Sequence, residues 1–285
     1  MRYMKSALLA LLAGAAAWLA PAAAHAQMMH VDSNDWRQTD RHDVLQGSQA
    51  KPSFLVELRF GPYLPDIDSG VTGGTPFKDV FGYDCGTQTE SSVTPRFAFG
   101  LEADYMAVRI PYVGAIGPGV GWSYTNFSAL ARDTKTPSIC SGETTSLTIM
   151  PMHLSAVLRA DELMRRTGIP IVPYGKFGVG MAWWRASDDL GTEQVCGTAS
   201  AQASCGGGAP VLASGTGLTP SLHFALGGAI ALNFLEPMTA ARLDESAGVH
   251  HAYVFGEYYN DQLILSKNVM RVGVSSWVVG LAVDF

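Results

Sequence analysis

The strongest constraint on the fold is an alternation of residue types over the last seventeen positions, Val269 to Phe285. Five bulky residues share one face of an extended chain: Trp277, Val279, Leu281, Val283 and Phe285. The opposite face has Val278 as its single bulky apolar residue and otherwise carries Ser276, Gly280, Ala282 and Asp284. A period of two residues is that of a β-strand with one apolar side.

The aromatic residue at position 285 adds to this interpretation, because no polar tail follows it. Bacterial outer-membrane barrels commonly end on such a strand, and their assembly machinery recognises the terminal aromatic residue. We therefore expect the five bulky residues to form an assembly signal. The expected partners are outer-membrane lipid and, during biogenesis, the barrel assembly machinery.

The composition of the chain limits the remaining fold classes. Hydrophobic residues make up 47% of the sequence and charged residues only 15%, whereas a soluble domain normally carries about a quarter charged residues. Beyond the N-terminal segment no run of eighteen apolar residues occurs, so a membrane-spanning helix is excluded. A buried sandwich or a transmembrane barrel remains.

The N-terminus has the pattern of a secretory signal peptide. Arg2 and Lys5 precede an apolar stretch from Ala7 to Leu19, and small residues at Ala24 and Ala26 mark a cleavage site. We predict a signal peptide over 1–26, a polar periplasmic arm over 27–52 and a barrel domain over 53–285. Cleavage changes the formal net charge from −6 to −8, which argues against nucleic-acid binding.

The alternation recurs in eight segments, which begin near residues 53, 96, 112, 144, 169, 219, 251 and 269. The number is even, both termini fall on one side, and short and long connections alternate broadly as in outer-membrane barrels. A bilayer also requires closure, since each unpaired backbone group in hydrocarbon costs several kcal/mol. The sequence predicts an all-β fold, an eight-stranded closed antiparallel transmembrane β-barrel. The apolar face of the fourth segment changes phase at Pro151, which predicts a β-bulge there.

The interior of an eight-stranded barrel is only wide enough for side chains to fill it. Small residues on the inward faces of the third and fifth segments leave room for charged neighbours. We predict a paired network of lumen charges rather than an open pore, formed by Glu57, Arg59, Glu102, Asp104, Lys176 and Glu257.

The four cysteines of an exported protein favour disulfides over metal or redox chemistry. Cys196 and Cys205 enclose eight residues, a suitable span, and Cys85 with Cys140 would then join the first two outer loops. Neither a CxxC pair nor a nearby histidine supports a metal site. We expect neither a metal nor a cofactor.

Several of these segments together resemble a known family of small outer-membrane β-barrel proteins that is widespread in myxobacteria and their relatives. The similar blocks are SFLVELRFGPYLPDID from Ser53, FGLEADY from Phe99, PYVGAIGPGVGW from Pro111, TSLTIMPMHLSAVLR from Thr145, IPIVPYGKFGVGMAWW from Ile169, LDESAGVHHAYVFGEYY from Leu243 and SSWVVGLAVDF from Ser275. The resemblance implies one barrel domain in the outer membrane. It implies no established activity and no catalytic residues.

The leading functional hypothesis is a non-enzymatic protein of the cell outer membrane that stabilises the membrane or presents loops for binding. The sequence indicates no particular external ligand. A second hypothesis is a lipid-modifying hydrolase, because alternation places His153 and Ser155 on one face, interpreted as the lipid face, where some lipid-modifying barrels carry such a pair. That chemistry needs an orienting acid as well. A small pore and a soluble lipocalin-like carrier are further alternatives.

Overall fold

The computed structural model describes residues 53–132, 140–189, 191–192, 194–196, 211–235, 238, 245–265 and 270–285. The predicted signal peptide, the predicted periplasmic arm and Cys205 lie outside these residues. Among the described residues, no helix is both long enough and apolar enough to cross a bilayer.

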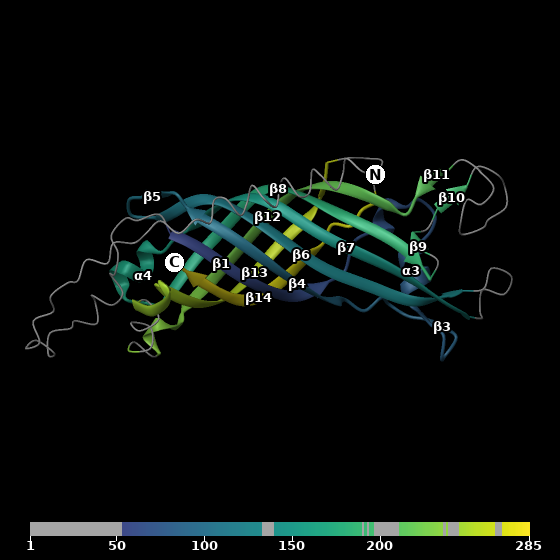
Figure 1. Ribbon diagram of the computed structural model, residues 1–285, viewed down its shortest axis with the longest axis horizontal. Helices are drawn as coiled ribbons and strands as arrows, with labels where there is room; N and C mark the ends of the chain where they lie inside the picture. The colour runs from purple at the N-terminus through teal and green to yellow at the C-terminus, as the bar shows by residue number, and fades with distance from the viewer. Residues whose placement is uncertain are drawn as a thin grey trace, which may run out of the picture. The chain divides into compact units, whose positions relative to one another are not determined.

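Eight antiparallel strands of the described chain close into a ring (Figure 1). They are β1 (Ser53–Tyr63), β4 (Arg96–Met106), β6 (Gly114–Arg132), β7 (Cys140–Arg159), β8 (Ile171–Asp188), β12 (Thr216–Ala231), β13 (His251–Ile264) and β14 (Ser275–Asp284). Each strand pairs with the next, and β14 pairs with β1. At the closure, Leu58 of β1 lies between Leu101 of β4 and Leu281 of β14. The predicted fold class is confirmed.

The smaller elements lie at the two ends of the barrel. We call the end where β1 begins and β14 ends the terminal end, and the opposite end the loop end. At the terminal end are β5 (Val108–Ile110), α4 (Glu162–Thr167) and η3 (Leu232–Phe234). The loop end carries η1 (Asp68–Gly70), α3 (Pro76–Phe81), β2 (Tyr83–Asp84), β3 (Thr89–Glu90), β9 (Gly191–Thr192), β10 (Gln194–Cys196) and β11 (Val211–Ser214).

Alternation along each strand separates the two faces of the wall by chemistry. Outward side chains are large and apolar, and they remain exposed on the barrel surface: Phe177 is 61%, Leu154 58% and Trp277 56% exposed. Inward side chains are buried, and at many positions they are small or polar, as at Ala225 and Glu57. The bulky residues predicted as an assembly signal are on the outward face, where Val283 is partly buried.

The last strand is shorter than the alternation in the sequence predicts. β14 begins at Ser275, and the residues before it leave the wall and enter the barrel. Val272 and Val274 are buried there, and the Val272 carbonyl accepts a hydrogen bond of 2.5 Å from the Tyr63 hydroxyl. The Met270 carbonyl accepts a further hydrogen bond of 2.7 Å from Thr219. The segment therefore fills the lumen instead of extending the sheet.

The predicted β-bulge at Pro151 is wrong. Pairing of β7 with β8 runs in one register through Pro151, which faces Ala182, and the same register continues on both sides. Leu147 and Ile149 are buried in the lumen, and the inward positions after Pro151 are mostly polar, with Val157 as the apolar exception. The apparent change of phase arises because the lumen changes from apolar to polar along β7, while the strand geometry stays the same.

Candidate functional site: the lumen and its loop-end mouth

The middle of the lumen is filled by a cluster of buried ion pairs. The Lys176 ammonium lies 2.8 Å from Glu57, 2.9 Å from Glu102 and 3.2 Å from Glu257. Arg59 forms ion pairs with Glu102 and Glu257. All five side chains are at most 5% exposed, so each pair is removed from water. Five of the six residues predicted for the lumen network thus come together.

The strand register explains why these charges need one another. Glu57 of β1 and Glu102 of β4 are directly opposite across the two strands. Two carboxylates in that position repel each other. Lys176 reaches them from β8 and supplies the compensating charge. A buried pair of this kind becomes strongly destabilising when one partner is lost, because the other charge stays desolvated.

Asp104, the sixth predicted residue, also lies in the lumen, but it lacks the expected pairing among the described residues. Its side chain is fully buried in the lumen, but neither carboxylate oxygen has a hydrogen-bond partner among the described residues. An oxygen of Asp104 lies within 4.8 Å of oxygens of Glu57 and Glu102, a grouping that suits a hard cation in composition. Lys176 already provides a cation to two of these carboxylates. Asp104 therefore adds a further carboxylate to the cluster, without a hydrogen bond of its own among the described residues.

A pair of stacked histidines lies beside the ion pairs, and it was not predicted. The rings of His153 and His223 are parallel within 3°, with centroids 3.8 Å apart. His223 Nδ1 is 2.7 Å from Asp261 Oδ1, and His153 Nε2 is 3.4 Å from Glu102 Oε1. The alternation of β7 runs without interruption from Arg159 back through Pro151. Counting back from the buried Arg159 in steps of two residues would therefore have placed His153 inward.

The hydrolase hypothesis loses its geometric basis here. His153 and Ser155 share a face as predicted, but that face points into the lumen, and Ser155 is only 4% exposed. The Ser155 hydroxyl has no hydrogen-bond partner among the described residues, so it makes no hydrogen bond with His153. A nucleophile needs a base within hydrogen-bond reach and access to substrate. The interpretation of these two residues as a lipid-facing pair is wrong.

Toward the loop end the lumen becomes apolar, which the sequence analysis missed. α3 enters the mouth of the barrel, and its Phe77 ring packs edge-on against Phe127 of β6 with centroids 5.2 Å apart. The Asp68 carboxylate holds the start of α3, since it accepts hydrogen bonds from the backbone N–H groups of Phe77 (2.8 Å) and Lys78 (3.0 Å). The Asp68 side chain thus satisfies two N–H groups that the first helical turn leaves without partners.

A disulfide ties the α3 region to the barrel wall. It joins Cys85, which follows β2, to Cys140, the first residue of β7, with 5.9 Å between the Cα atoms. This is the pairing expected from the sequence, although Cys140 belongs to a strand and not to a loop. The expected Cys196–Cys205 pair falls outside the described residues.

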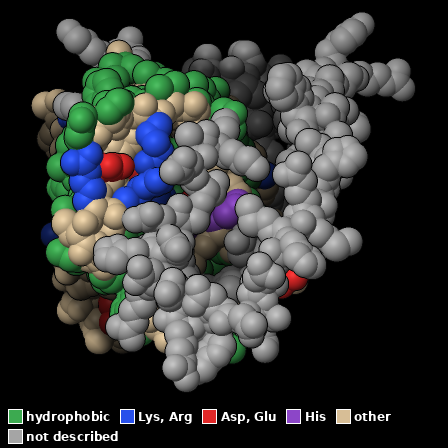
Figure 2. All heavy atoms as spheres, turned by 90° about the vertical axis from the view of Figure 1, so that its left-hand side faces the viewer, with side chains coloured by type: hydrophobic (Ala, Val, Ile, Leu, Met, Phe, Trp, Pro, Cys, Tyr) green, Lys and Arg blue, Asp and Glu red, His purple; other side chains and the backbone are tan. Residues whose placement is uncertain are grey.

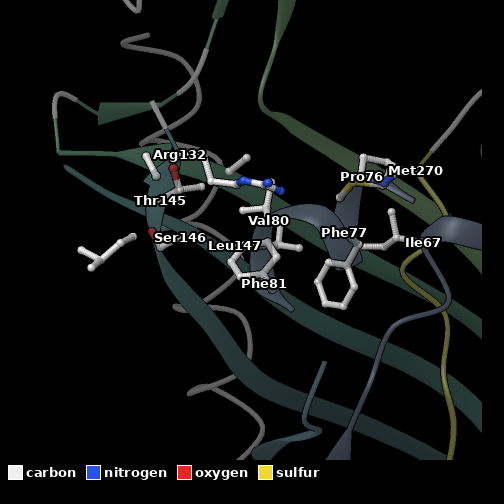
Figure 3. A pocket seen from close by; sticks show the side chains of 13 residues that line it. Ile67, Pro76, Phe77, Val80, Phe81, Arg132, Thr145, Ser146, Leu147 and Met270 are labelled. Carbon is white, nitrogen blue, oxygen red and sulfur yellow. The ribbon is translucent and has the colours of Figure 1, made fainter. Parts of the chain in front are cut away.

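An apolar pocket of about 380 Å³ remains between α3 and the wall formed by β6, β7 and β8 (Figure 3). We call it the mouth pocket. It is lined mainly by hydrocarbon, including Ile67, Phe77, Val80, Phe81, Leu147 and Met270. Arg132 of β6 extends along one side toward α3, where its guanidinium donates a hydrogen bond of 3.3 Å to the Asp79 carbonyl. The pocket thus combines an apolar interior with a guanidinium.

The terminal end has a different surface, where basic and acidic side chains lie close together (Figure 2). Arg109 of β5 pairs with Asp161 at 2.5 Å, and Arg166 of α4 pairs with Glu162 at 2.9 Å. The Arg166 guanidinium also stacks over the Tyr112 ring, 4.5 Å from its centroid. The contacts of Arg109 with Asp161 and of Arg166 with Tyr112 hold the β5–β6 turn against the α4 region.

Comparisons with known proteins were made on sequence and on structure. No protein-family model matches the chain, and no curated protein sequence matches it. The chain is similar to the solved structure of the outer membrane protein OprG from Pseudomonas aeruginosa, at 13% identity and a TM-score of 0.42, over 84% of this chain and 98% of that one. It is also similar to Ail, the attachment invasion locus protein of Yersinia pestis, at 12% identity and a TM-score of 0.37, over 84% of this chain and 100% of that one. Neisserial surface protein A (NspA) gives 13% identity and a TM-score of 0.36, over 82% and 97%. The fold assignment itself follows from the strand pairings above.

Proposed function

We propose that the chain is a non-enzymatic β-barrel of the cell outer membrane that closes its own lumen and binds ligands through its loop-end mouth. The observation that carries this proposal is the division of side chains between the two faces of the wall. Phe177, Leu154, Trp277 and similar residues form an exposed apolar surface around the ring, while a cluster of ionised residues that includes Arg59 and Lys176 is buried inside it. A soluble protein rarely exposes so continuous an apolar surface, whereas lipid tails solvate it.

The same division argues against a soluble lipocalin-like carrier. Such a carrier needs a polar exterior and an apolar interior that holds its ligand, because the exterior faces water. Here the centre of the barrel holds Arg59, Lys176 and three glutamates, and the exterior is hydrocarbon. Closure of the sheet satisfies the backbone groups that a bilayer would otherwise leave unpaired.

Two features support a closed lumen rather than a pore. The ion pairs around Lys176 fill the middle of the barrel, and α3 and the segment 270–274 fill the loop end. An eight-stranded ring has little space beyond its side chains. In planar bilayers we expect no steady conductance above that of protein-free bilayers. Reproducible single-channel steps would refute the closed lumen.

The proposed orientation places the terminal end in the periplasm and the loop end outside. The longer connections gather at the end of the barrel that carries the Cys85–Cys140 disulfide, and outer-membrane barrels have their longer loops outside. The outward residues of β14, Trp277 and Leu281 among them, would serve the barrel assembly machinery as a recognition strand. A relationship of this chain to the small barrel family of myxobacteria and their relatives is part of the same proposal.

Quenching of tryptophan fluorescence by lipids with brominated acyl chains tests the central claim. Trp277 is 56% exposed on the outward face, whereas Trp184 packs against the buried core. Two single-tryptophan variants, one keeping Trp277 and one keeping Trp184, should differ: strong quenching is expected for Trp277 and weak quenching for Trp184. Equal quenching, or a monomeric protein that stays dissolved without detergent, would refute the membrane assignment.

A further inference from the structure

We infer that the mouth pocket is a binding site for a small amphipathic monocarboxylate, a molecule with a compact hydrocarbon body and one carboxylate group. The inference deepens the proposed function and rests on it, because the pocket must open to the outside of the cell. It concerns the space between α3 and the wall of β6, β7 and β8, and it is independent of the ion pairs in the middle of the lumen.

The size and lining of the pocket define the body of the ligand. A volume of about 380 Å³ is near the lower end of the range of roughly 300–1,000 Å³ that is typical of small-molecule sites. Phe77, Phe81 and Leu147 form apolar walls. A lipid with several acyl chains does not fit this volume, whereas a single short alkyl or aryl-alkyl group does. Its transfer from water into the pocket is favoured by the apolar area that it buries.

Arg132 defines the charge of the ligand. A guanidinium is always charged in proteins and matches a carboxylate in a two-pronged geometry. Among the described residues, Glu90 of β3 is a carboxylate neighbour of this guanidinium, 3.8 Å away, with a side chain that is 54% exposed. An ion pair that is so exposed to water contributes little free energy. A ligand carboxylate, held in place by the apolar walls, can therefore replace Glu90 beside Arg132.

The rest of the Arg132 environment keeps the guanidinium in position for this exchange. It stacks over the Tyr83 ring at 4.1 Å and donates to the Asp79 carbonyl. The Asp68 contacts hold the start of α3, and the Cys85–Cys140 disulfide ties the segment after α3 to Cys140, the sheet partner of Arg132. A site whose parts are already in place loses less conformational entropy on binding.

The test measures binding of 4-phenylbutyrate, and of the uncharged analogue 4-phenylbutan-1-ol, to the full chain in lipid nanodiscs by isothermal titration calorimetry. Empty nanodiscs correct for partition into lipid. We expect the wild type to bind the carboxylate more tightly than the alcohol. Arg132→Gln should weaken carboxylate binding ~10-fold and leave the alcohol nearly unchanged, since one charge-assisted pair is lost. Glu90→Gln should strengthen carboxylate binding, because it removes the competing carboxylate.

A matched pair of tryptophan substitutions tests the location of the site. Ala186 of β8 lines the mouth pocket, whereas Ala156 of β7 is exposed on the outward face. Ala186→Trp should abolish binding of both probes by filling the pocket, and Ala156→Trp should leave it unchanged. Heat-modifiable gel mobility establishes that each variant still forms the barrel.

Three outcomes would overturn the inference. They are an absence of binding by wild-type protein, equal affinity for the carboxylate and the alcohol, and binding that survives Ala186→Trp. Each is distinguishable from failure of the proposed function, because the brominated-lipid measurement on Trp277 reports membrane insertion independently of the pocket.

Discussion

His153 of β7 and His223 of β12 stack face to face inside the barrel, with their ring centroids 3.8 Å apart and their planes within 3° of each other. Each ring has a carboxylate neighbour, Glu102 for His153 and Asp261 for His223. The pair occupies the lumen beside the buried ion pairs, out of reach of lipid. This relationship changes the meaning of a His-x-Ser motif from a possible active site to part of the barrel filling.

The first prediction concerns that motif. Alanine at His153 or at Ser155 should leave the phospholipid and lipopolysaccharide composition of the outer membrane unchanged, because neither side chain reaches the lipid face. Mass spectrometry of extracted lipids from cells that express the wild type or each variant measures this. A lipid species that disappears with either alanine would restore the hydrolase hypothesis.

The second prediction concerns the cation at the centre of the lumen. Lys176→Met removes the charge that Glu57, Glu102 and Glu257 share. We expect the free energy of unfolding to fall by about 3–5 kcal/mol, because the carboxylates remain buried without that partner. Urea unfolding in lipid vesicles, followed by tryptophan fluorescence, provides the measurement.

Lys78→Met is the matched control, since the Lys78 side chain is exposed on α3. It should change the free energy of unfolding by no more than about 0.5 kcal/mol. Similar effects of the two substitutions would show that the ion pairs of Lys176 do not stabilise the barrel.

The third prediction is that removing the charge of two neighbouring carboxylates changes the free energy of unfolding in opposite directions. Asp104 is fully buried without a hydrogen-bond partner among the described residues, whereas Glu257 is an ion-pair partner of both Arg59 and Lys176. Asp104→Asn should raise the free energy of unfolding by about 1 kcal/mol, because it removes repulsion from Glu57 and Glu102. Glu257→Gln should lower it by at least as much. Destabilisation by both substitutions would mean that Asp104 has a favourable partner.

The fourth prediction concerns two glycines in the barrel wall. A Cβ atom on Gly178 of β8 would lie 2.0 Å from the Leu154 carbonyl oxygen, so the backbones of β8 and β7 would have to separate. A Cβ atom on Gly228 of β12 would have no neighbour within 4 Å among the described residues. Gly178→Ala should destabilise the barrel by about 1–3 kcal/mol, and Gly228→Ala should be close to neutral. Equal unfolding midpoints for the two variants would contradict the close approach at Gly178.

The fifth prediction concerns the disulfide at the loop end. Cys85 and Cys140 are separated by 55 positions in the sequence, and a cross-link of that span restricts the unfolded chain by up to about 4 kcal/mol. Replacing both cysteines by serine should lower the free energy of unfolding by about 2–4 kcal/mol while the barrel still forms. Unfolding curves of this variant and of the wild type without reductant provide the comparison. Superimposable curves would show that the cross-link does not stabilise the fold.

Much of the wall could be predicted from the sequence because its signal is local. Trp277, Val279 and Leu281 alternate with small residues, and each strand carries its own version of that pattern. Eight such strands in a bilayer must close, since an open edge would leave backbone groups without partners. The inward placement of Glu57, Lys176 and Glu257 then follows from counting along each strand. Within one strand, the sequence alone therefore determined which face each residue occupies.

Only the tertiary structure decided what fills the lumen. Lys176 and Glu57 are 119 positions apart, and their contact depends on the register of every strand between them. The same holds for the stacking of His153 on His223, and for the entry of α3 into the mouth beside Phe127. Leu147 and Ile149 share the inward face of β7 with His153, because the strand keeps its register through Pro151. The first two residues lie in the apolar loop end of the lumen and His153 lies in its polar middle, so the sequence pattern imitates a bulge at Pro151. The periodicity of a strand specifies its two faces, but only closure of the barrel specifies what each face contacts.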